Sequence, residues 1–329
     1  MNRRKFLGAA SAAAFTPYFF SAARADDNKA IPGFDQTETA ADSNQAWQPY
    51  TDRKLRVGLA GYGFCQFSAE FSFQTHPNVE IVAVTDLFKD RCDALAKRVQ
   101  CEKQYESLEK MVEDDSIEAI FCATDAPSHA KHAIMCLEHG KHVCHAVPVF
   151  YGDIDWAEKL LECCKKHPDL KYAMFETSVY RDDCYAMEKI YGAGGFGRIL
   201  YSEGEYCHTK EPGAPHYPSY GEWRANGAPL WYPTHATAYY VGVTHKSFID
   251  VSATGVLPLD DPNPEPNGVG NIFESELGVF RTSEGGLSRM MCNDSYGVYL
   301  EAGRVRGEIG GMDGTYTPFD QAYTGTEDG

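Results

Sequence analysis

A glycine turn between two apolar segments constrains the fold of this 329-residue chain more than any other feature. Residues 55–60 form an apolar run that predicts a strand, and this run enters a turn that contains Gly61 and Gly63. A segment with helical spacing follows, and a second run of β-branched residues, 79–85, ends at Asp86. Strand, glycine turn, helix and strand in this order are typical of the first βαβ unit of a dinucleotide-binding sheet.

The turn predicts how a dinucleotide would be held. Gly61 permits the tight turn, and Gly63 lets the backbone approach a pyrophosphate at the start of the next helix. The carboxylate of Asp86 would accept hydrogen bonds from the adenosine ribose and repel a 2′-phosphate, so the predicted cofactor is NAD. Gln66 occupies the position of the third glycine of the motif. The alternative interpretation is therefore a glycine turn that binds no nucleotide. The predicted cofactor contacts in this region are Gly61, Tyr62, Gly63, Phe64 and Asp86.

Charge limits the partners of the chain. It carries 30 Lys and Arg against 47 Asp and Glu, a formal net charge of −17. Because phosphate backbones and anionic membrane surfaces would repel such a chain, we expect neither a nucleic-acid nor a membrane partner. A small neutral ligand fits this charge better, and 329 residues suffice for two domains with sizeable cores.

The N-terminal segment predicts a targeting signal rather than part of the folded domain. Arg3 and Arg4 precede a short Ala-rich apolar stretch, and a small-x-small cleavage site ends at Ala25. Residues 1–25 are therefore similar to a twin-arginine signal peptide, which implies export to the periplasm of a protein that folds before it crosses. The apolar stretch is short for the alternative, an uncleaved membrane anchor. Residues 26–53 lack periodicity and are predicted to be an exposed linker.

Alternating strands and helices over residues 54–177 predict an α/β fold, with an NAD-binding Rossmann domain built on a doubly wound parallel sheet. The pattern changes over residues 178–329, where longer strands predict an α+β domain on a largely antiparallel sheet. One face of this second sheet is expected to pack on helices, and the other to join subunits of a homo-oligomer. Predicted strands of the first domain cover residues 55–60, 79–85, 103–106, 117–123, 142–147 and 171–175, and its helices 88–99, 108–113, 127–139 and 154–166. Predicted strands of the second cover 198–208, 248–256, 272–281, 287–292 and 304–309, and its helices 181–191 and 234–243.

Eleven cysteines are scattered over these elements without the Cys-x-x-Cys spacing of zinc sites. The sequence therefore predicts no metal site and indicates that most cysteines are small buried hydrophobic residues. A disulfide formed after export remains an open alternative.

Several short motifs resemble those of the Gfo/Idh/MocA oxidoreductases. They are Thr124-Asp125-Ala126-Pro127-Ser128-His129, Gly140-Lys141-His142-Val143 and Phe196-Gly197-Arg198-Ile199. Dehydrogenases of that family carry a Glu-Lys-Pro triplet, whose lysine lies by the nicotinamide, and an Asp-x-x-x-His pair. The corresponding segments here are Ala146-Val147-Pro148 and Trp231-Tyr232-Pro233-Thr234-His235, so the lysine and the aspartate are both absent. Family members usually continue with a further strand and helix, so the resemblance also implies that this chain stops short of a full second domain.

These departures are similar to the NAD-dependent glycosidases of glycoside hydrolase family 109. The shared features are Val147-Pro148, a Glu-x-x-x-Tyr segment ending at Tyr180 and a Tyr-Pro-Thr-His segment ending at His235. The resemblance implies an enzyme with tightly bound NAD that oxidises a sugar or glycoside hydroxyl and restores the cofactor within each turnover. The alternatives are a net sugar or polyol dehydrogenase and an inactive nucleotide- or sugar-binding protein.

Oxidation of a hydroxyl needs a general base, and an imidazole has a suitable pKa. His235 follows a Pro-containing turn and opens a helix, so it is the predicted base, with a backbone-bonded histidine as the alternative. Tyr180 and Tyr232 are predicted to orient substrate or relay a proton, although packing roles are equally open in a chain with 20 tyrosines.

Two further histidines belong to the predicted cofactor site. His145 stands near the position of the missing lysine and could substitute for it, or strand alternation could turn it into the core. His129 is expected to brace the loop over the cofactor. His208 is predicted to contact the substrate, with a position at the surface as the alternative. The remaining predicted cofactor contacts are Thr124 and Val147, and the predicted substrate contacts are His208 and Trp231.

Overall fold

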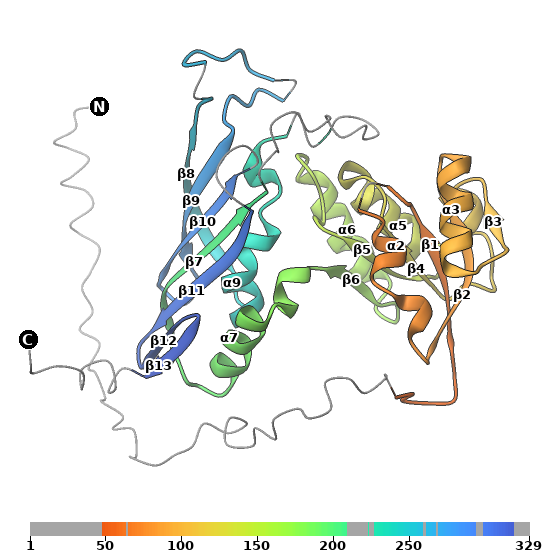
Figure 1. Ribbon diagram of the computed structural model, residues 1–329, viewed down its shortest axis with the longest axis horizontal. Helices are drawn as coiled ribbons and strands as arrows, with labels where there is room; N and C mark the ends of the chain where they lie inside the picture. The colour runs from red at the N-terminus through yellow and green to blue at the C-terminus, as the bar shows by residue number, and fades with distance from the viewer. Residues whose placement is uncertain are drawn as a thin grey trace, which may run out of the picture.

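The computed structural model describes residues 48–63, 65–208, 223, 227–258, 261–267, 269–293 and 299–318. The predicted signal peptide, most of the predicted linker and Phe64 lie outside the described residues. The described chain forms two sheets, one of six strands and one of seven, each covered by its own helices (Figure 1).

The N-terminal sheet is parallel and has the strand order β3-β2-β1-β4-β5-β6. Its strands are β1 Leu55–Ala60, β2 Val79–Thr85, β3 Gln104–Tyr105, β4 Ala119–Cys122, β5 His142–Ala146 and β6 Tyr172–Phe175. Its helices are α2 Phe67–Glu70, α3 Lys89–Val99, α4 Leu108–Met111, α5 His129–Glu138 and α6 Asp155–Lys166, with 3₁₀ turns η1 Phe73–Thr75 and η2 Ala126–Ser128. The predicted doubly wound parallel sheet is thus confirmed, and the strand order reverses at β1.

Helices cover both faces of this sheet, which explains why its central strands are apolar throughout. All four residues of β4 are buried. Ile120 packs in a core with residues of α5 and α6, whereas its neighbour Phe121 packs in a second core with residues of α3. Successive side chains of one strand therefore enter opposite cores, as strand geometry requires.

The segment after the glycine turn differs from the predicted continuous helix. It forms only the four-residue α2 and the short η1, because Gln66 and Ser72 adopt left-handed backbone conformations at φ 50° and 57°. The Phe71 ring packs at 5.4 Å from Phe121 and at 6.0 Å from Phe175. Aromatic packing onto the sheet thus takes precedence over helix continuation in this segment.

The second sheet has the order β13-β12-β11-β7-β10-β9-β8, and every pair except β10 with β7 is antiparallel. Its strands are β7 Ile199–Cys207, β8 Phe248–Val256, β9 Ser275–Thr282, β10 Leu287–Asn293, β11 Leu300–Gly307, β12 Gly310–Asp313 and β13 Thr315–Pro318. The prediction of a largely antiparallel sheet is confirmed, but β11 begins at Leu300 rather than at residue 304, and β12 and β13 were not predicted.

Helices α7 Asp182–Gly192 and α9 Thr234–Thr244 cover one face of this sheet, the face turned toward the N-terminal sheet (Figure 1). Tyr239, Tyr240 and Val243 of α9 are fully buried there. Gly204 of β7 permits this close packing, since an added Cβ would lie 1.9 Å from the carbonyl oxygen of Ala236. The 3₁₀ turns η3 Thr177–Tyr180 and η4 Pro229–Trp231 lead into α7 and α9.

Eight of the eleven cysteines are buried, which fits their predicted role as small hydrophobic residues. Within the described ranges, no helix has the length and apolarity needed to cross a membrane. The described residues also hold no group of three or more His, Cys, Asp or Glu side chains placed to bind a metal ion.

Candidate active site

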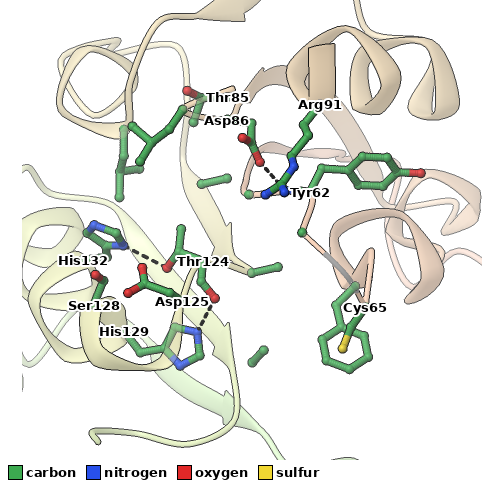
Figure 2. Close-up of a pocket in the computed structure, with 18 of the residues that line it drawn as sticks. Tyr62, Cys65, Thr85, Asp86, Arg91, Thr124, Asp125, Ser128, His129 and His132 are labelled. Atoms are coloured by element: carbon green, nitrogen blue, oxygen red, sulfur yellow. Dashed lines mark hydrogen bonds between the residues drawn. The ribbon is translucent and has the colours of Figure 1, made fainter. Parts of the chain in front are cut away.

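A cavity of about 870 Å³ opens at the carboxyl ends of the parallel strands, where the strand order reverses (Figure 2). Ligands of open α/β sheets bind at this kind of switch point. The cavity is lined by residues of the glycine turn, by residues that follow β2, β4 and β5, and by two aromatic residues from the C-terminal part of the chain. Those that the argument uses are Gly61, Tyr62, Gly63, Asp86, Arg91, Thr124, His129, Val147, Trp223 and Tyr232.

The glycine turn is held tightly against the strand ends. Gly61 has a φ of +91°, and an added Cβ would lie 2.5 Å from the carbonyl oxygen of Ala123, so only glycine fits here. The amide of Gly61 donates to Thr85 O at 2.8 Å, and the hydroxyl of Ser68 donates to Gly61 O at 2.7 Å. Gly63 differs, because its added Cβ would meet no atom within 4 Å. Its bare backbone therefore leaves room for a ligand to approach.

Asp86 lies at the end of β2 and anchors the turn. Its Oδ2 accepts the amide of Tyr62 at 2.7 Å, and its Oδ1 accepts the amide of Phe88 at 2.8 Å (Figure 2). Each carboxylate oxygen retains a second lone pair, which could accept a ribose hydroxyl. Arg91 of α3 lines the same end of the cavity. The turn, the open Gly63 backbone and the Asp86 carboxylate together fit a dinucleotide.

The opposite wall is braced by His129 at the start of α5. Its Nδ1 lies 2.8 Å from Pro148 O and its Nε2 lies 3.0 Å from Thr124 O, so the ring links the loops after β4 and β5. Burial lowers the pKa of His129, against the two carbonyl contacts that raise it, and in its neutral form the ring donates to one of these two carbonyls. The hydroxyl of Thr124 is within 2.9 Å of Nδ1 of His132 (Figure 2).

His145 lies behind this wall, and it is not among the residues that line the cavity. Its ring is fully buried, stacks on His129 at 4.9 Å and is within 2.8 Å of the Tyr172 hydroxyl. Val147 takes the place beside the cavity instead. The structure thus puts an apolar side chain at the position of the missing lysine and turns His145 into the core.

The buried His145 predicts a pH dependence of stability. Burial lowers its pKa to about 3, so below the ordinary value of 6.5 the unfolded chain binds a proton that the folded protein does not. As the pH falls from 6 to 4, we expect the free energy of unfolding to drop by roughly 1 kcal/mol per pH unit more in the native protein than in His145→Gln. Urea unfolding at each pH measures this. The exposed His139→Gln serves as control, and equal slopes for native protein and His145→Gln would contradict the prediction.

On the other side of the site, His235 opens α9 and is only 7% exposed. Its Nδ1 lies 2.6 Å from Oε1 of Glu176 and 3.0 Å from Oγ of Ser178. Because Nδ1 is engaged, Nε2 is the nitrogen that can accept a proton from a substrate.

Glu176 is a buried carboxylate that holds the imidazole. Its Oε1 also accepts the amide of Ser178 at 2.8 Å. Burial raises the pKa of Glu176, but the bond and charge of His235 and the Ser178 amide outweigh this, and the net pKa lies below its ordinary value. An ionised carboxylate at Nδ1 fixes the tautomer of the ring and stabilises the imidazolium, as in other histidine–carboxylate pairs.

Aromatic rings connect His235 with the cavity. The ring of Tyr206 lies 4.5 Å and that of Tyr232 lies 5.5 Å from the imidazole. Tyr232 in turn stacks on Trp223 at 6.2 Å, and both of these residues line the cavity. The predicted base and the predicted cofactor residues are therefore brought to neighbouring parts of one site.

Other predicted residues lie apart from this group. Tyr180 is 75% exposed, and the structure does not bring it to the cavity. Trp231 packs its ring against Tyr151 at 5.3 Å, and His208 lies beyond Tyr206, with ring centroids 5.9 Å apart.

Sequence reasoning missed several residues of the site. Ser178 and Tyr206 contact the imidazole from distant parts of the chain, and Glu301 contacts Ser178 across 123 residues. The Glu-x-x-x-Tyr segment pointed toward Glu176, but no local spacing identifies the other three.

Comparison with known proteins agrees with this geometry. Residues 55–174 match the family model described as oxidoreductase family, NAD-binding Rossmann fold. Over 185 residues, 52% of this chain, it is 29% identical to glycosyl hydrolase family 109 protein 1 of Bacteroides fragilis and 31% identical to that of Bacteroides thetaiotaomicron. The match covers 38% of each relative, so the chain spans about two fifths of their length.

Solved structures share the fold at low identity. Scyllo-inositol dehydrogenase from Lactobacillus casei with bound NAD(H) and scyllo-inositol aligns with a TM-score of 0.63 and 17% identity, over 79% of this chain and 76% of that chain. A probable dehydrogenase from Thermotoga maritima aligns with a TM-score of 0.65 and 17% identity, over 80% and 76%. Residues 55–174, with their glycine turn, Asp86 and switch-point cavity, therefore form an NAD-binding Rossmann domain of the Gfo/Idh/MocA family.

Proposed function

We propose that this protein acts on a hydroxyl of a sugar or glycoside with tightly bound NAD and restores the cofactor within each turnover, as a glycosidase. The observation that carries the proposal is the buried pair of His235 and Glu176, whose imidazole packs against Tyr232, a residue that lines the cavity. A net dehydrogenase of a sugar or polyol is the second candidate, because the solved structures with this fold include inositol dehydrogenases.

The cofactor would be held by the backbone at Gly61 and Gly63 and by the carboxylate of Asp86. Bound NAD would supply a hydride acceptor and, later in the same turnover, a hydride donor. Asp86 favours NAD over NADP because its charge repels a 2′-phosphate.

In this proposal the proton transfers are carried out by His235 of α9, which is held by Glu176. Nε2 of His235 would take the proton of the substrate hydroxyl while Glu176 stabilises the positive ring at Nδ1. Once the hydroxyl carbon is a ketone, the neighbouring C–H is acidic. A second group beside His235, for which Tyr232 is the neighbouring hydroxyl, would take this proton, and the leaving aglycone would take up the proton held on Nε2 of His235. Paired carboxylates of the ordinary glycosidase kind are then not required.

The wall beside β5 supports this assignment. Val147 lines the cavity where related dehydrogenases carry a lysine, and an apolar side chain can neither donate nor accept a proton. His145, the alternative on that wall, lies behind it. Proton transfer therefore falls to His235, with Tyr232 as the neighbouring hydroxyl that would orient the substrate.

The proposed location is the periplasm, on the strength of the N-terminal sequence. A redox-neutral cycle suits that compartment, since it offers no soluble nicotinamide pool to reoxidise NADH. Net oxidation would stop after one turnover.

We also propose a homo-oligomer that forms through the second sheet. Its face opposite α9 exposes Val279 and Leu287, at 41% and 48%, and these residues flank the charged group of Glu203, Arg289 and Arg304. Exposed apolar side chains beside arginines suit a subunit contact, because interfaces are apolar at their centre and enriched in Arg. Light scattering of the purified protein tests this, and a monomer at all concentrations would contradict it.

Turnover in deuterated water tests the redox-neutral cycle. We expect solvent deuterium at the carbon next to the transiently oxidised one, and no net accumulation of NADH, with methyl and aryl glycosides as probes. Proton NMR and mass spectrometry of the product locate the label. Product without deuterium would exclude the cycle. Stoichiometric NADH would identify a net dehydrogenase, and retained NAD without any turnover would identify a binding protein.

A further inference from the structure

Ser178 joins His235 to a second buried carboxylate, that of Glu301. Ser178 is fully buried in η3, and its Oγ lies 3.0 Å from Nδ1 of His235. The same hydroxyl donates a hydrogen bond to Oε1 of Glu301. Since Glu301 belongs to β11 and His235 to α9, the fold brings three distant segments together around one hydroxyl.

The outer end of this group reaches solvent. Oε2 of Glu301 accepts the hydroxyl of Tyr299 at 3.3 Å and lies 3.4 Å from Nη1 of Arg181. The Arg181 side chain is 42% exposed and Tyr299 is 57% exposed, whereas Glu301 itself is buried. Hydrogen bonds thus lead from the buried imidazole through Ser178 and Glu301 to the exposed Tyr299, and the Arg181 side chain is ion-paired at the same end.

We propose that Ser178 and Glu301 relay to solvent the proton that His235 removes from the substrate. The inference rests on the proposed function, in which His235 is the base. Glu176 is closer to Nδ1, but the donors to its Oε1 are His235 and the Ser178 amide, both in the interior. Glu176 therefore holds the ring, whereas Glu301 connects it to exposed side chains.

The transfer balances without any change of oxidation state in the protein. The substrate proton binds Nε2 of His235, the Nδ1 proton moves to Oγ of Ser178, and the Ser178 hydroxyl proton moves to Oε1 of Glu301. The neutral imidazole then carries its proton on Nε2, and its Nδ1 accepts the Ser178 hydroxyl; because Glu176 favours a proton on Nδ1, this tautomer lasts only until Nε2 gives up its proton. Glu301 becomes a carboxylic acid that loses its proton to solvent beside Tyr299. When His235 gives up the Nε2 proton later in the cycle, Glu301 and Ser178 return a proton from solvent to Nδ1.

The relay predicts when a proton appears in solution. We would mix the NAD-loaded protein with the methyl glycoside that it oxidises fastest, in weak buffer, and follow nicotinamide reduction by absorbance and released protons with a pH indicator. In the native protein both signals should rise together. In Ser178→Ala and Glu301→Gln, proton release should lag behind nicotinamide reduction by roughly tenfold or more, because the proton stays on the imidazole.

Two further variants separate a relay from simple positioning. Ser178→Thr keeps a hydroxyl and should restore simultaneous release, and Glu205→Gln, on the opposite face of the sheet, should behave as native. Glu301→Gln still accepts the Ser178 hydrogen bond, so it tests the relay even if Ser178→Ala does not fold. If both relay variants slow the two signals equally, Ser178 and Glu301 only position His235, and the relay is overturned. If the native protein shows no nicotinamide reduction with any glycoside, the proposed function fails instead.

Discussion

Replacing His235 with alanine should lower turnover by roughly 10²–10⁴-fold while the purified protein keeps its NAD. In the proposed function the imidazole is the general base, and the wall of the cavity beside β5 carries Val147, which cannot exchange protons. Cofactor binding should persist because Gly61 and Asp86 lie on the other sheet. Steady-state kinetics with methyl and aryl glycosides, together with mass spectrometry of the cofactor released on denaturation, measure both quantities.

The alanine variant leaves Glu176 buried without its partner, so a loss of activity could reflect unfolding. His235→Gln provides a second test, because its amide can still donate to Glu176 but cannot act as a base. His245→Asn, just after the end of the same helix, is the matched control and should retain native activity, since asparagine tolerates the left-handed backbone there. An unchanged rate in a folded His235 variant would contradict the assignment and leave Tyr232 as the nearest proton carrier.

Replacing Asp86 with alanine should weaken NAD binding by about 1–3 kcal/mol, or roughly 5–150-fold, through loss of charge-assisted hydrogen bonds to the ribose. The same change removes the acceptor for the Tyr62 amide, which loosens the glycine turn. Calorimetric titration of cofactor-free protein with NAD and with NADP measures the effect.

Asp86→Asn separates the charge from the hydrogen bonds. It can still accept a bond from Tyr62, but it no longer repels a 2′-phosphate, so we expect the preference for NAD over NADP to narrow. Asp93→Ala changes an exposed carboxylate of α3, the helix that follows Asp86, where it pairs with Lys89, and should leave both affinities unchanged. Tighter binding of NADP than of NAD by the native protein would contradict the role given to Asp86.

The N-terminal sheet could be predicted because its signals are local. Strand β1 and strand β2 have the bounds that their apolar runs indicate, and Gly61 and Asp86 stand at fixed offsets from them. The broken helix after the turn was missed, because two left-handed residues and the packing of Phe71 onto the sheet decide it. Tertiary contacts of that kind leave no periodic pattern in the sequence.

The candidate active site was predictable only in part. His235 could be named because a proline turn precedes it and a helix follows, and its partner Glu176 lies in a recognisable segment. Glu301, by contrast, reaches Ser178 across 123 residues, so no spacing rule connects them. Tyr180 has the expected sequence position, yet its side chain is directed to solvent, because the 3₁₀ turn η3 buries Ser178 instead.

Strand β7 has a consequence for how the molecule folds. Both of its neighbours, β10 and β11, come from residues 287–307, far along the chain from β7 itself. During synthesis β7 therefore emerges without a strand to pair with, whereas β1 finds β2 after one short connection. Because such non-local pairing slows folding and leaves strand edges open, the second sheet should assemble only after residues 287–307 have been synthesised, onto an N-terminal sheet that is already formed.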